Sequence, residues 1–140
     1  MHVGGIILKF ELTILLVLVN VAVYGYTSFV GGDFLNTNIK VLEKFGQVNL
    51  YVIVYGTYWQ LFTAMFVHVN LPHLILNMFF LLIFGLRAEE LFKGEEFLFI
   101  YLASGLAGNL LTLLLPPLTI SAGASGAMFG TFGASIIYMR

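Results

Sequence analysis

The feature that most constrains this chain is the run of apolar residues from Leu12 to Phe29, which no charged side chain interrupts. A helix of about 20 apolar residues is long enough to cross the hydrocarbon core of a bilayer. Further apolar segments follow at residues 73–92, 95–115 and 125–140. Because spanning segments must satisfy their backbone hydrogen bonds internally, these runs predict an all-α, polytopic membrane helical bundle.

Composition favours one membrane domain over residues 1–140. Hydrophobic residues make up 60% of the chain and charged residues only 9%, whereas a soluble domain carries about a quarter charged residues. The net charge of −1 gives no basic field for nucleic acid. The absence of cysteine excludes disulfides, thiol catalysis and cysteine-based metal sites, and we expect no cofactor.

A signal peptide is the alternative interpretation of the first apolar run, with Lys9 in its charged start. Residues 20–24 offer no good small-x-small cleavage site, and more apolar segments follow. We therefore expect residues 12–29 to form a retained helix.

Residues 30–72 are expected to form a structured interfacial loop. Within them, the spacing of apolar residues predicts a short amphipathic helix over Ile39–Phe45. Hydropathy alone would assign residues 50–67 to another span, but Gly56 interrupts that segment. It also carries aromatic side chains of the kind that prefer the membrane–water interface, namely Tyr51, Tyr55, Tyr58 and Trp59.

The four-span arrangement divides the basic residues into Lys9, Arg87, Lys93 and Arg140 on one side and Lys40 and Lys44 on the other. By the positive-inside rule, we expect a multi-pass protein of the cell membrane with a cytoplasmic N-terminus. A fifth span at residues 50–67 would give a stronger bias, so charge alone does not favour four spans. In either arrangement, the helices beginning at His73 and Ser125 start on the same side.

Polar side chains at depth in a membrane are costly and often functional. Asn77 lies one helical turn after His73, so both face one side of a helix, and His68 precedes them in the loop. The ordinary interpretation is that such groups hydrogen-bond between helices and hold them together. A zinc site is a second alternative, but the spacing of His68 and His73 does not match a helical metal motif and no third ligand is evident. We expect no metal.

Gly123-Ala124-Ser125-Gly126 is a G-x-S-G motif at the start of a predicted helix. Unpaired N–H groups and the helix dipole at such a position stabilise an oxyanion. Alternatively, the small residues serve only close helix packing, and we expect the Gly126/Gly130 face to be left uncovered or filled by lipid or a second copy of the chain. A serine facing His73 and Asn77 at the same depth is the layout of an acyl-transfer site.

This set of motifs resembles the rhomboid family of intramembrane serine proteases. The matching elements, in order and spacing, are Trp59, His68-Val-Asn-Leu-Pro-His73-Leu-Ile-Leu-Asn77, Glu89, and Gly123-Ala-Ser125-Gly-Ala-Met-Phe-Gly130. Each motif is weak alone, but the set is specific. The preceding helix and the long loop also fit.

The resemblance implies a six-helix core fold with a serine–histidine dyad that cleaves transmembrane helices with small or helix-breaking residues near the cleaved bond. Ser125 would be the nucleophile. Asn77, His73 and the Ser125 backbone N–H would form the oxyanion hole. His68 would hold the loop near the site, and Phe129 would pack on the catalytic histidine. The segment around Trp59 would lie in the outer leaflet, which favours four spans.

The chain departs from the family pattern at two points. Gln60 stands where many members have arginine, so a loop anchor is expected to differ. The family's base histidine comes from the sixth helix, and none of His2, His68 and His73 matches it. We therefore expect an incomplete rhomboid-like bundle: a fragment, a truncated product, or half of a split enzyme whose base comes from missing C-terminal helices or a separate chain.

Two functions of other classes remain open. One is a catalytically inactive rhomboid-like scaffold that binds transmembrane segments; retention of Ser125, Asn77 and His73 argues against it. The other is a small transporter subunit, which the scarcity of charged residues within the spans disfavours. Expected partners are transmembrane substrates and membrane lipid.

Overall fold

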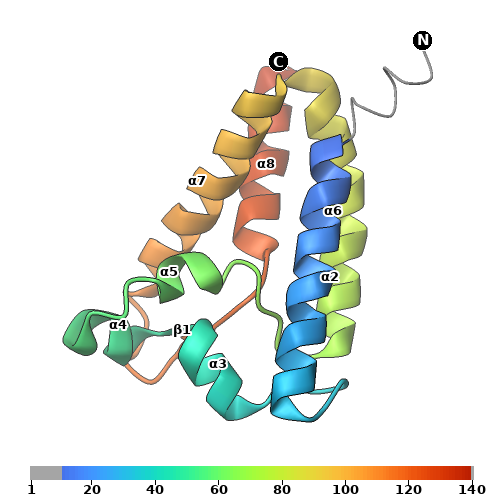
Figure 1. Cartoon of the computed structure of the whole chain (residues 1–140). Coiled ribbons are helices and arrows are strands. Elements are labelled where there is room, and N and C mark those ends of the chain that lie inside the picture. Colours follow the sequence, from blue (N-terminus) through green and yellow to red (C-terminus); the bar gives the residue numbers. More distant parts are fainter. Residues whose placement is uncertain (1–10, 140) are drawn as a thin grey trace.

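The computed structural model describes residues 11–139, so His2, Lys9 and Arg140 lie outside it. Four long helices form the bundle in Figure 1: α2 (Glu11–Gly31), α6 (Leu71–Leu91), α7 (Gly94–Thr112) and α8 (Ser125–Tyr138). α2 packs along α6, and α8 packs between α6 and α7. Large side chains such as Phe97, Tyr101 and Leu81 are fully buried at its centre. The predicted all-α bundle is confirmed.

Helix ends differ from the predicted ones for local reasons. α6 begins at Leu71 rather than His73, because the Asn70 side chain caps the helix by accepting the His73 N–H at 2.8 Å, and Pro72 is tolerated in the first turn. α7 ends at Thr112 rather than Leu115, because tight turns replace the helix before Pro116.

The segment between α2 and α6 contains three short helices, α3 (Ile39–Phe45), α4 (Asn49–Tyr55) and α5 (Gln60–Thr63). The predicted short helix at residues 39–45 is confirmed, with Val41 and Leu42 buried. Residues 50–67 are divided between α4, α5 and turns. Since α4 has seven residues and so a length of about 10 Å, it cannot cross a bilayer core of about 30 Å.

A small antiparallel strand pair joins this segment to the connection before α8. β1 (Gln47–Val48) pairs with β2 (Ile120–Ser121). An isolated bridge between Asn36 and Asn70 holds the other end of the segment close to the start of α6. The segment is thus fastened to the loops that precede both α6 and α8.

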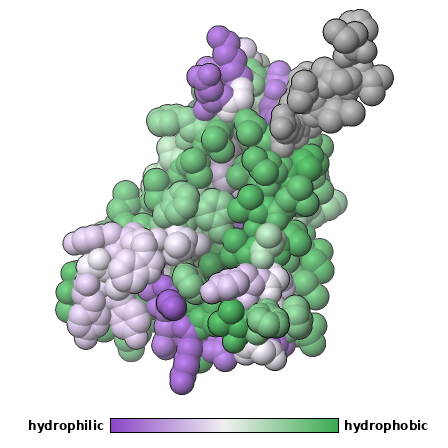
Figure 2. Space-filling model, viewed as in Figure 1, coloured by the Kyte–Doolittle hydropathy of each residue, from purple (hydrophilic) through white to green (hydrophobic). Residues whose placement is uncertain are grey.

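Among the described helices, α2 and α6 are long and apolar enough to cross a membrane by themselves. Four spans are expected from the sequence. The other two long helices differ from α2 and α6: α7 carries Glu95 and Glu96 in its first turn, and α8 has only 14 residues, a length of about 21 Å. Figure 2 shows an apolar band over the helices between two more polar ends. Such a surface suits a protein surrounded by lipid rather than water.

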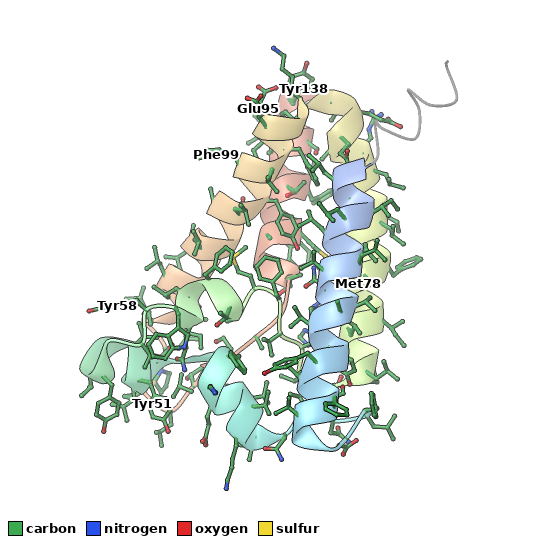
Figure 3. All side chains as sticks on the ribbon, viewed as in Figure 1. Tyr51, Tyr58, Met78, Glu95, Phe99 and Tyr138 are labelled. Carbon is green, nitrogen blue, oxygen red and sulfur yellow. The ribbon has the colours of Figure 1, made fainter. Side chains whose placement is uncertain are left out.

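The helices alternate in direction, so α6 and α8 begin at the same end of the bundle, as the sequence analysis expected (Figure 1). α3, α4 and α5 lie at that end as well. Tyr51 and Tyr58 mark it in Figure 3, whereas Glu95 and Tyr138 mark the opposite end. The residues expected to carry chemistry, at the starts of α6 and α8, therefore lie at the end covered by the interfacial segment.

Candidate functional site

The first turns of α6 present a histidine–asparagine pair. Nε2 of His73 lies 3.2 Å from Nδ2 of Asn77, one helical turn further along the same face. Asn77 is buried, at 5% exposure, whereas His73 is half-buried. The pair is therefore held among protein atoms but keeps access from one side.

Gly123 brings the connection before α8 directly onto this pair. Its φ of +118° lies in a region that side chains rarely adopt. A Cβ at this position would lie 2.7 Å from Cε1 of His73 and 3.2 Å from Nδ2 of Asn77. The Gly123 N–H also donates to the Ala64 carbonyl at 2.8 Å, which ties the connection to the interfacial segment. Only a glycine allows the backbone to run this close to both side chains.

Ser125 lies two residues beyond Gly123 and is the first residue of α8. It is half-buried, and it occupies a helix N-terminus, where free N–H groups and the dipole favour negative charge. The structure thus brings His73, Asn77 and Gly123 into contact and places Ser125 at the edge of that contact. Direct approach of the Ser125 hydroxyl to Asn77 remains a prediction.

The small residues of α8 serve close packing against α7. A Cβ on Gly130 would collide with the Ser104 side chain, and the Gly126 position approaches Gly105 within 3.9 Å. The expectation that the Gly126/Gly130 face is left uncovered or filled by lipid or a second copy is therefore wrong for Gly130, because α7 fills it. Gly126 itself is exposed, and Phe129 is 63% exposed.

A backbone N–H beside His73 bears on which of its ring nitrogens carries the proton. The Val69 N–H points at Nδ1 of His73 at 3.4 Å, while the Asn77 amide meets Nε2. A neutral imidazole has one N–H and one acceptor nitrogen, so two donors cannot both be satisfied. The backbone N–H is fixed, whereas the oxygen and nitrogen of an asparagine amide can be exchanged by a flip. The satisfied arrangement has Nδ1 accepting from Val69 and Nε2–H donating to the Asn77 oxygen.

This tautomer makes His73 a hydrogen-bond donor toward the Gly123 side of the site. A donor at this position can stabilise negative charge on a reacting oxygen. It cannot accept a proton from Ser125 at the same nitrogen. In this tautomer, His73 cannot act as a general base through Nε2.

His68 is buried beneath this pair. It is 0% exposed, and its ring centroid lies 5.1 Å from that of His73. Burial, and then repulsion from His73, lower the pKa of His68 to about 4. Neither ring nitrogen has a protein hydrogen-bond partner within residues 11–139. The ring is thus neutral at physiological pH. The backbone carbonyl of His68 holds the loop in place by accepting a hydrogen bond from the Thr37 hydroxyl at 2.6 Å.

Sequence reasoning noticed Gln60 but not its partners. Oε1 of Gln60 accepts the Val48 N–H at 3.0 Å, and Nε2 donates to the Glu43 carbonyl at 2.7 Å. The amide therefore supplies a loop anchor. The buried Gln47 and Asn49 were missed altogether; their signal was the presence of amides within an otherwise apolar stretch.

Glu89, one of the motif residues, is 8% exposed at the other end of α6. Its Oε1 accepts the Thr13 N–H at 2.5 Å, at the start of α2. Among residues 11–139, no three metal-ligating side chains gather. The polar groups of α6 thus divide into a contact between helices at one end and the His73–Asn77 pair at the other.

Comparison with known proteins agrees with this arrangement. The family model of the Rhomboid domain matches residues 55–140. RHOMBOID-like protein 6, mitochondrial, of Arabidopsis thaliana is 41% identical over 104 residues, which cover 74% of this chain and 34% of that protein. Rhomboid protease GluP of Bacillus subtilis is 37% identical over 99 residues, covering 71% and 19%.

Rhomboid-like protease 3 of Toxoplasma gondii is 43% identical over 75 residues, which cover 54% of this chain and 28% of that protein. The chain thus spans about a third or less of the length of these relatives. No solved structure matches the chain.

Proposed function

Because this chain belongs to the rhomboid family of membrane proteins, we propose that it forms the nucleophile-bearing part of an intramembrane serine endopeptidase. The observation that carries the proposal is that Gly123, two residues before Ser125, lies against His73 and Asn77. A polar pair half-enclosed beside a serine at a helix N-terminus is suited to acyl transfer. The substrates are transmembrane helices of other proteins, cleaved near small or helix-breaking residues.

In this reaction, the Ser125 hydroxyl attacks the carbonyl carbon of the scissile peptide bond. The oxygen that becomes negative is stabilised by the Asn77 NH₂ group, the backbone N–H of Ser125 and the Nε2–H of His73, which exchanges the Asn77 oxygen for the oxyanion. When the C–N bond breaks, the base passes the serine proton to the leaving amine, and an acyl ester remains on Ser125. Water then hydrolyses this ester, which releases the new carboxylate and restores the serine hydroxyl. Gly126 has no side chain to crowd the ester on the neighbouring Ser125.

The proton of Ser125 needs a base that neither described histidine supplies. His68 is fully buried with a pKa of about 4, so it is a weak base at neutral pH. On this proposal, His73 donates its Nε2–H to the oxyanion, so it does not accept the serine proton there. We propose that the base is a histidine of another segment, contributed by further helices or by a separate chain. On this proposal, Phe129 packs against that histidine, and its exposure one turn beyond Ser125 supports the assignment.

We place the protein in the cell membrane with its N-terminus on the cytoplasmic side. The support is the separation of Arg87 and Lys93, at the α6–α7 turn, from Lys40 and Lys44 in α3 at the opposite end of the bundle. The site then opens toward the outer leaflet.

A fluorophosphonate probe tests the proposal. The purified 140-residue chain is expected not to label, because loss of the base lowers the reactivity of a serine nucleophile by orders of magnitude, although an oxyanion hole alone retains about 10³-fold catalysis. Co-expression with the base-bearing segment of a relative should restore labelling, and Ser125→Ala should abolish it. Labelling of the chain alone would show that a base is already present. No labelling in either form would favour the inactive, helix-binding scaffold.

A further inference from the structure

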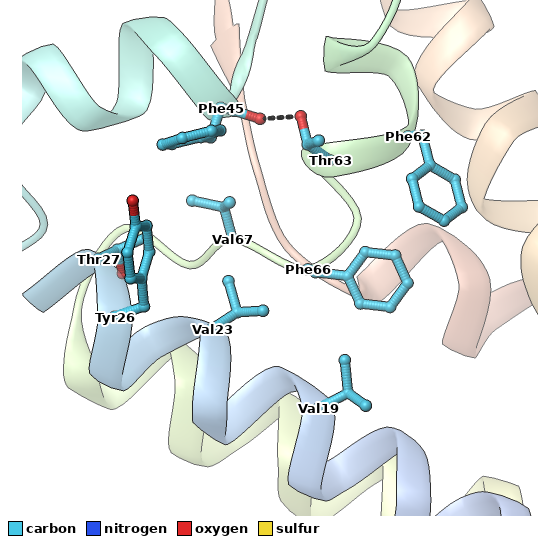
Figure 4. A pocket seen from close by; sticks show the side chains of 9 residues that line it. All are labelled: Val19, Val23, Tyr26, Thr27, Phe45, Phe62, Thr63, Phe66 and Val67. Carbon is cyan, nitrogen blue, oxygen red and sulfur yellow. Dashed lines mark hydrogen bonds between the residues drawn. The ribbon is translucent and has the colours of Figure 1, made fainter.

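An apolar groove lies between α2 and the interfacial segment, away from the site. It has a volume of about 420 Å³, within the range of ligand pockets. Two aromatic pairs frame it in Figure 4: Tyr26 with Phe45 at one end and Phe62 with Phe66 at the other. Val23 and Val67 lie between them, and Val19 lies deeper along α2.

The lining of the groove contains three side chains with hydroxyl groups, Tyr26, Thr27 and Thr63. The Thr63 hydroxyl in its lining donates to the Phe45 carbonyl at 2.6 Å, and the Thr27 hydroxyl donates to the Tyr24 carbonyl at 3.1 Å. Both hydroxyls are thus used within the protein. Apart from the Tyr26 hydroxyl, which belongs to an exposed side chain, the remaining lining is aliphatic and aromatic, so an apolar occupant gains most from entering.

The groove runs in the direction of a lipid chain. With a rise of about 1.5 Å per residue, Tyr26 lies about 8 Å and Val19 about 18 Å from the end of α2 at Gly31. The midplane of a bilayer lies about 15 Å below the edge of its hydrocarbon core. The groove therefore extends from interfacial depth to the middle of the membrane.

A cationic group stands at the interfacial end. The Lys44 Nζ lies 5.3 Å from the centroid of the Phe45 ring, and the Lys44 carbonyl accepts the indole N–H of Trp59 at 3.2 Å. Within residues 11–139, Lys44 makes no salt bridge and its side chain is exposed. Its ammonium group is therefore available to a phosphate at headgroup depth.

We propose that this groove binds one acyl chain of a glycerophospholipid, with the lipid phosphate beside Lys44. A transmembrane helix fits less well, because helices approach closely through small residues and the lining has no glycine, alanine or serine. The bound chain fills the space between α2 and the interfacial segment. It thereby fastens that segment, which also carries His68, to the first helix.

Native mass spectrometry of the purified chain in detergent, titrated with phosphatidylglycerol, tests the site. One lipid is expected to bind tightly. Val23→Phe and Val19→Phe, which fill the groove, should each weaken that binding at least ten-fold. Val21→Phe is the matched control: it adds the same ring to an exposed position of α2 outside the groove and should bind as the unmodified chain does. Lys44→Gln should weaken binding a few-fold.

Helical content and thermal unfolding, measured for each variant, identify any that misfold. If one of the two groove-filling variants misfolds, the other still tests the proposal. Brominated phosphatidylcholine gives a second readout, because Trp59 is the only tryptophan and its fluorescence reports on a chain near the groove mouth. Quenching should fall in Val23→Phe and not in Val21→Phe. Equal lipid binding by all variants, or a tight complex of two chains in place of the lipid adduct, would overturn the proposal.

Discussion

The buried polar groups at the site and those in the interfacial segment differ in what they bond to. Gln60 makes hydrogen bonds through both atoms of its amide, and Asn49 donates to the Thr112 carbonyl at 2.7 Å. At the site, the His73 ring is the only side-chain hydrogen-bond partner of the Asn77 amide within residues 11–139, and neither ring nitrogen of His68 has a partner there. Both groups are buried to a similar degree.

This difference separates structure from function within one apolar protein. Amide side chains that bond to backbone groups of other elements fix the path of the chain. If the chain took another path, those buried backbone groups would lose their hydrogen bonds, which costs free energy. Polar groups with spare hydrogen-bonding capacity contribute less to stability, and a pair with access from the surface, such as His73 with Asn77, is available to a ligand or a reacting atom. The contrast predicts that similar substitutions in the two groups have unequal effects.

The largest effect is expected for Gln60→Leu. This change leaves the buried Val48 N–H without its acceptor and the Glu43 carbonyl without its donor. It should lower the free energy of unfolding by about 3 kcal/mol. Asn77→Leu, the matched change at the site, removes one contact and should cost less than about 1 kcal/mol. Equal losses in chemical unfolding of the two variants would erase the distinction between the groups.

Acid should act on the site through His68. Its pKa is about 4 in the folded chain and 6.5 in the unfolded chain. The unfolded chain therefore binds the proton first as pH falls, so stability is complete above about 6.5 and declines toward pH 4, by about 3 kcal/mol in total. Unfolding measured from pH 7.5 to pH 4 checks this. His68→Phe should flatten the dependence; an unchanged slope would assign it to another group.

The same contrast governs what the sequence could predict. α2, α6 and the bounds of α3 follow from apolar runs and spacing, which are local signals. The contacts of Gln60 and Asn49 do not, because their partners are backbone groups of distant elements that no side chain identifies. Similarly, the small residues of α8 predicted a close helix contact, but only the structure shows that Ser104 of α7 fills it.

For the site, sequence spacing placed His73, Asn77 and Ser125 at the same end of the bundle. It did not predict that Gly123 lies against the first two, because that contact depends on the path of the loop after α7. The contact of the Val69 N–H with Nδ1 of His73 could not be predicted either, because a backbone N–H is present at every residue except proline.

A pair of glycine substitutions tests that contact. Gly123 and Gly32 both have positive φ, at +118° and +77°, but a Cβ on Gly32 would meet nothing within 4 Å. Gly32→Ala should therefore lower the free energy of unfolding by about 1 kcal/mol through backbone strain alone. Gly123→Ala should lower it by about 2 kcal/mol, because the methyl group also collides with His73. Thermal unfolding gives both values, and only Gly123→Ala should shift the NMR signals of the His73 ring.

The smallest effect, and the most specific, is the position of one proton on His73. If the Val69 N–H fixes Nδ1 as an acceptor, ¹⁵N NMR of histidine-labelled chain should show His73 with its proton on Nε2, with His73→Gln used to assign the signal. Val69→Pro removes the N–H and should allow the other tautomer, in which Asn77 donates to Nε2, whereas Val69→Ala keeps the N–H and the tautomer. A proton on Nδ1 in the unmodified chain would contradict this. His73 would then be an acceptor, able to serve as a base for Ser125, and the oxyanion would depend on Asn77 and the α8 N-terminus alone.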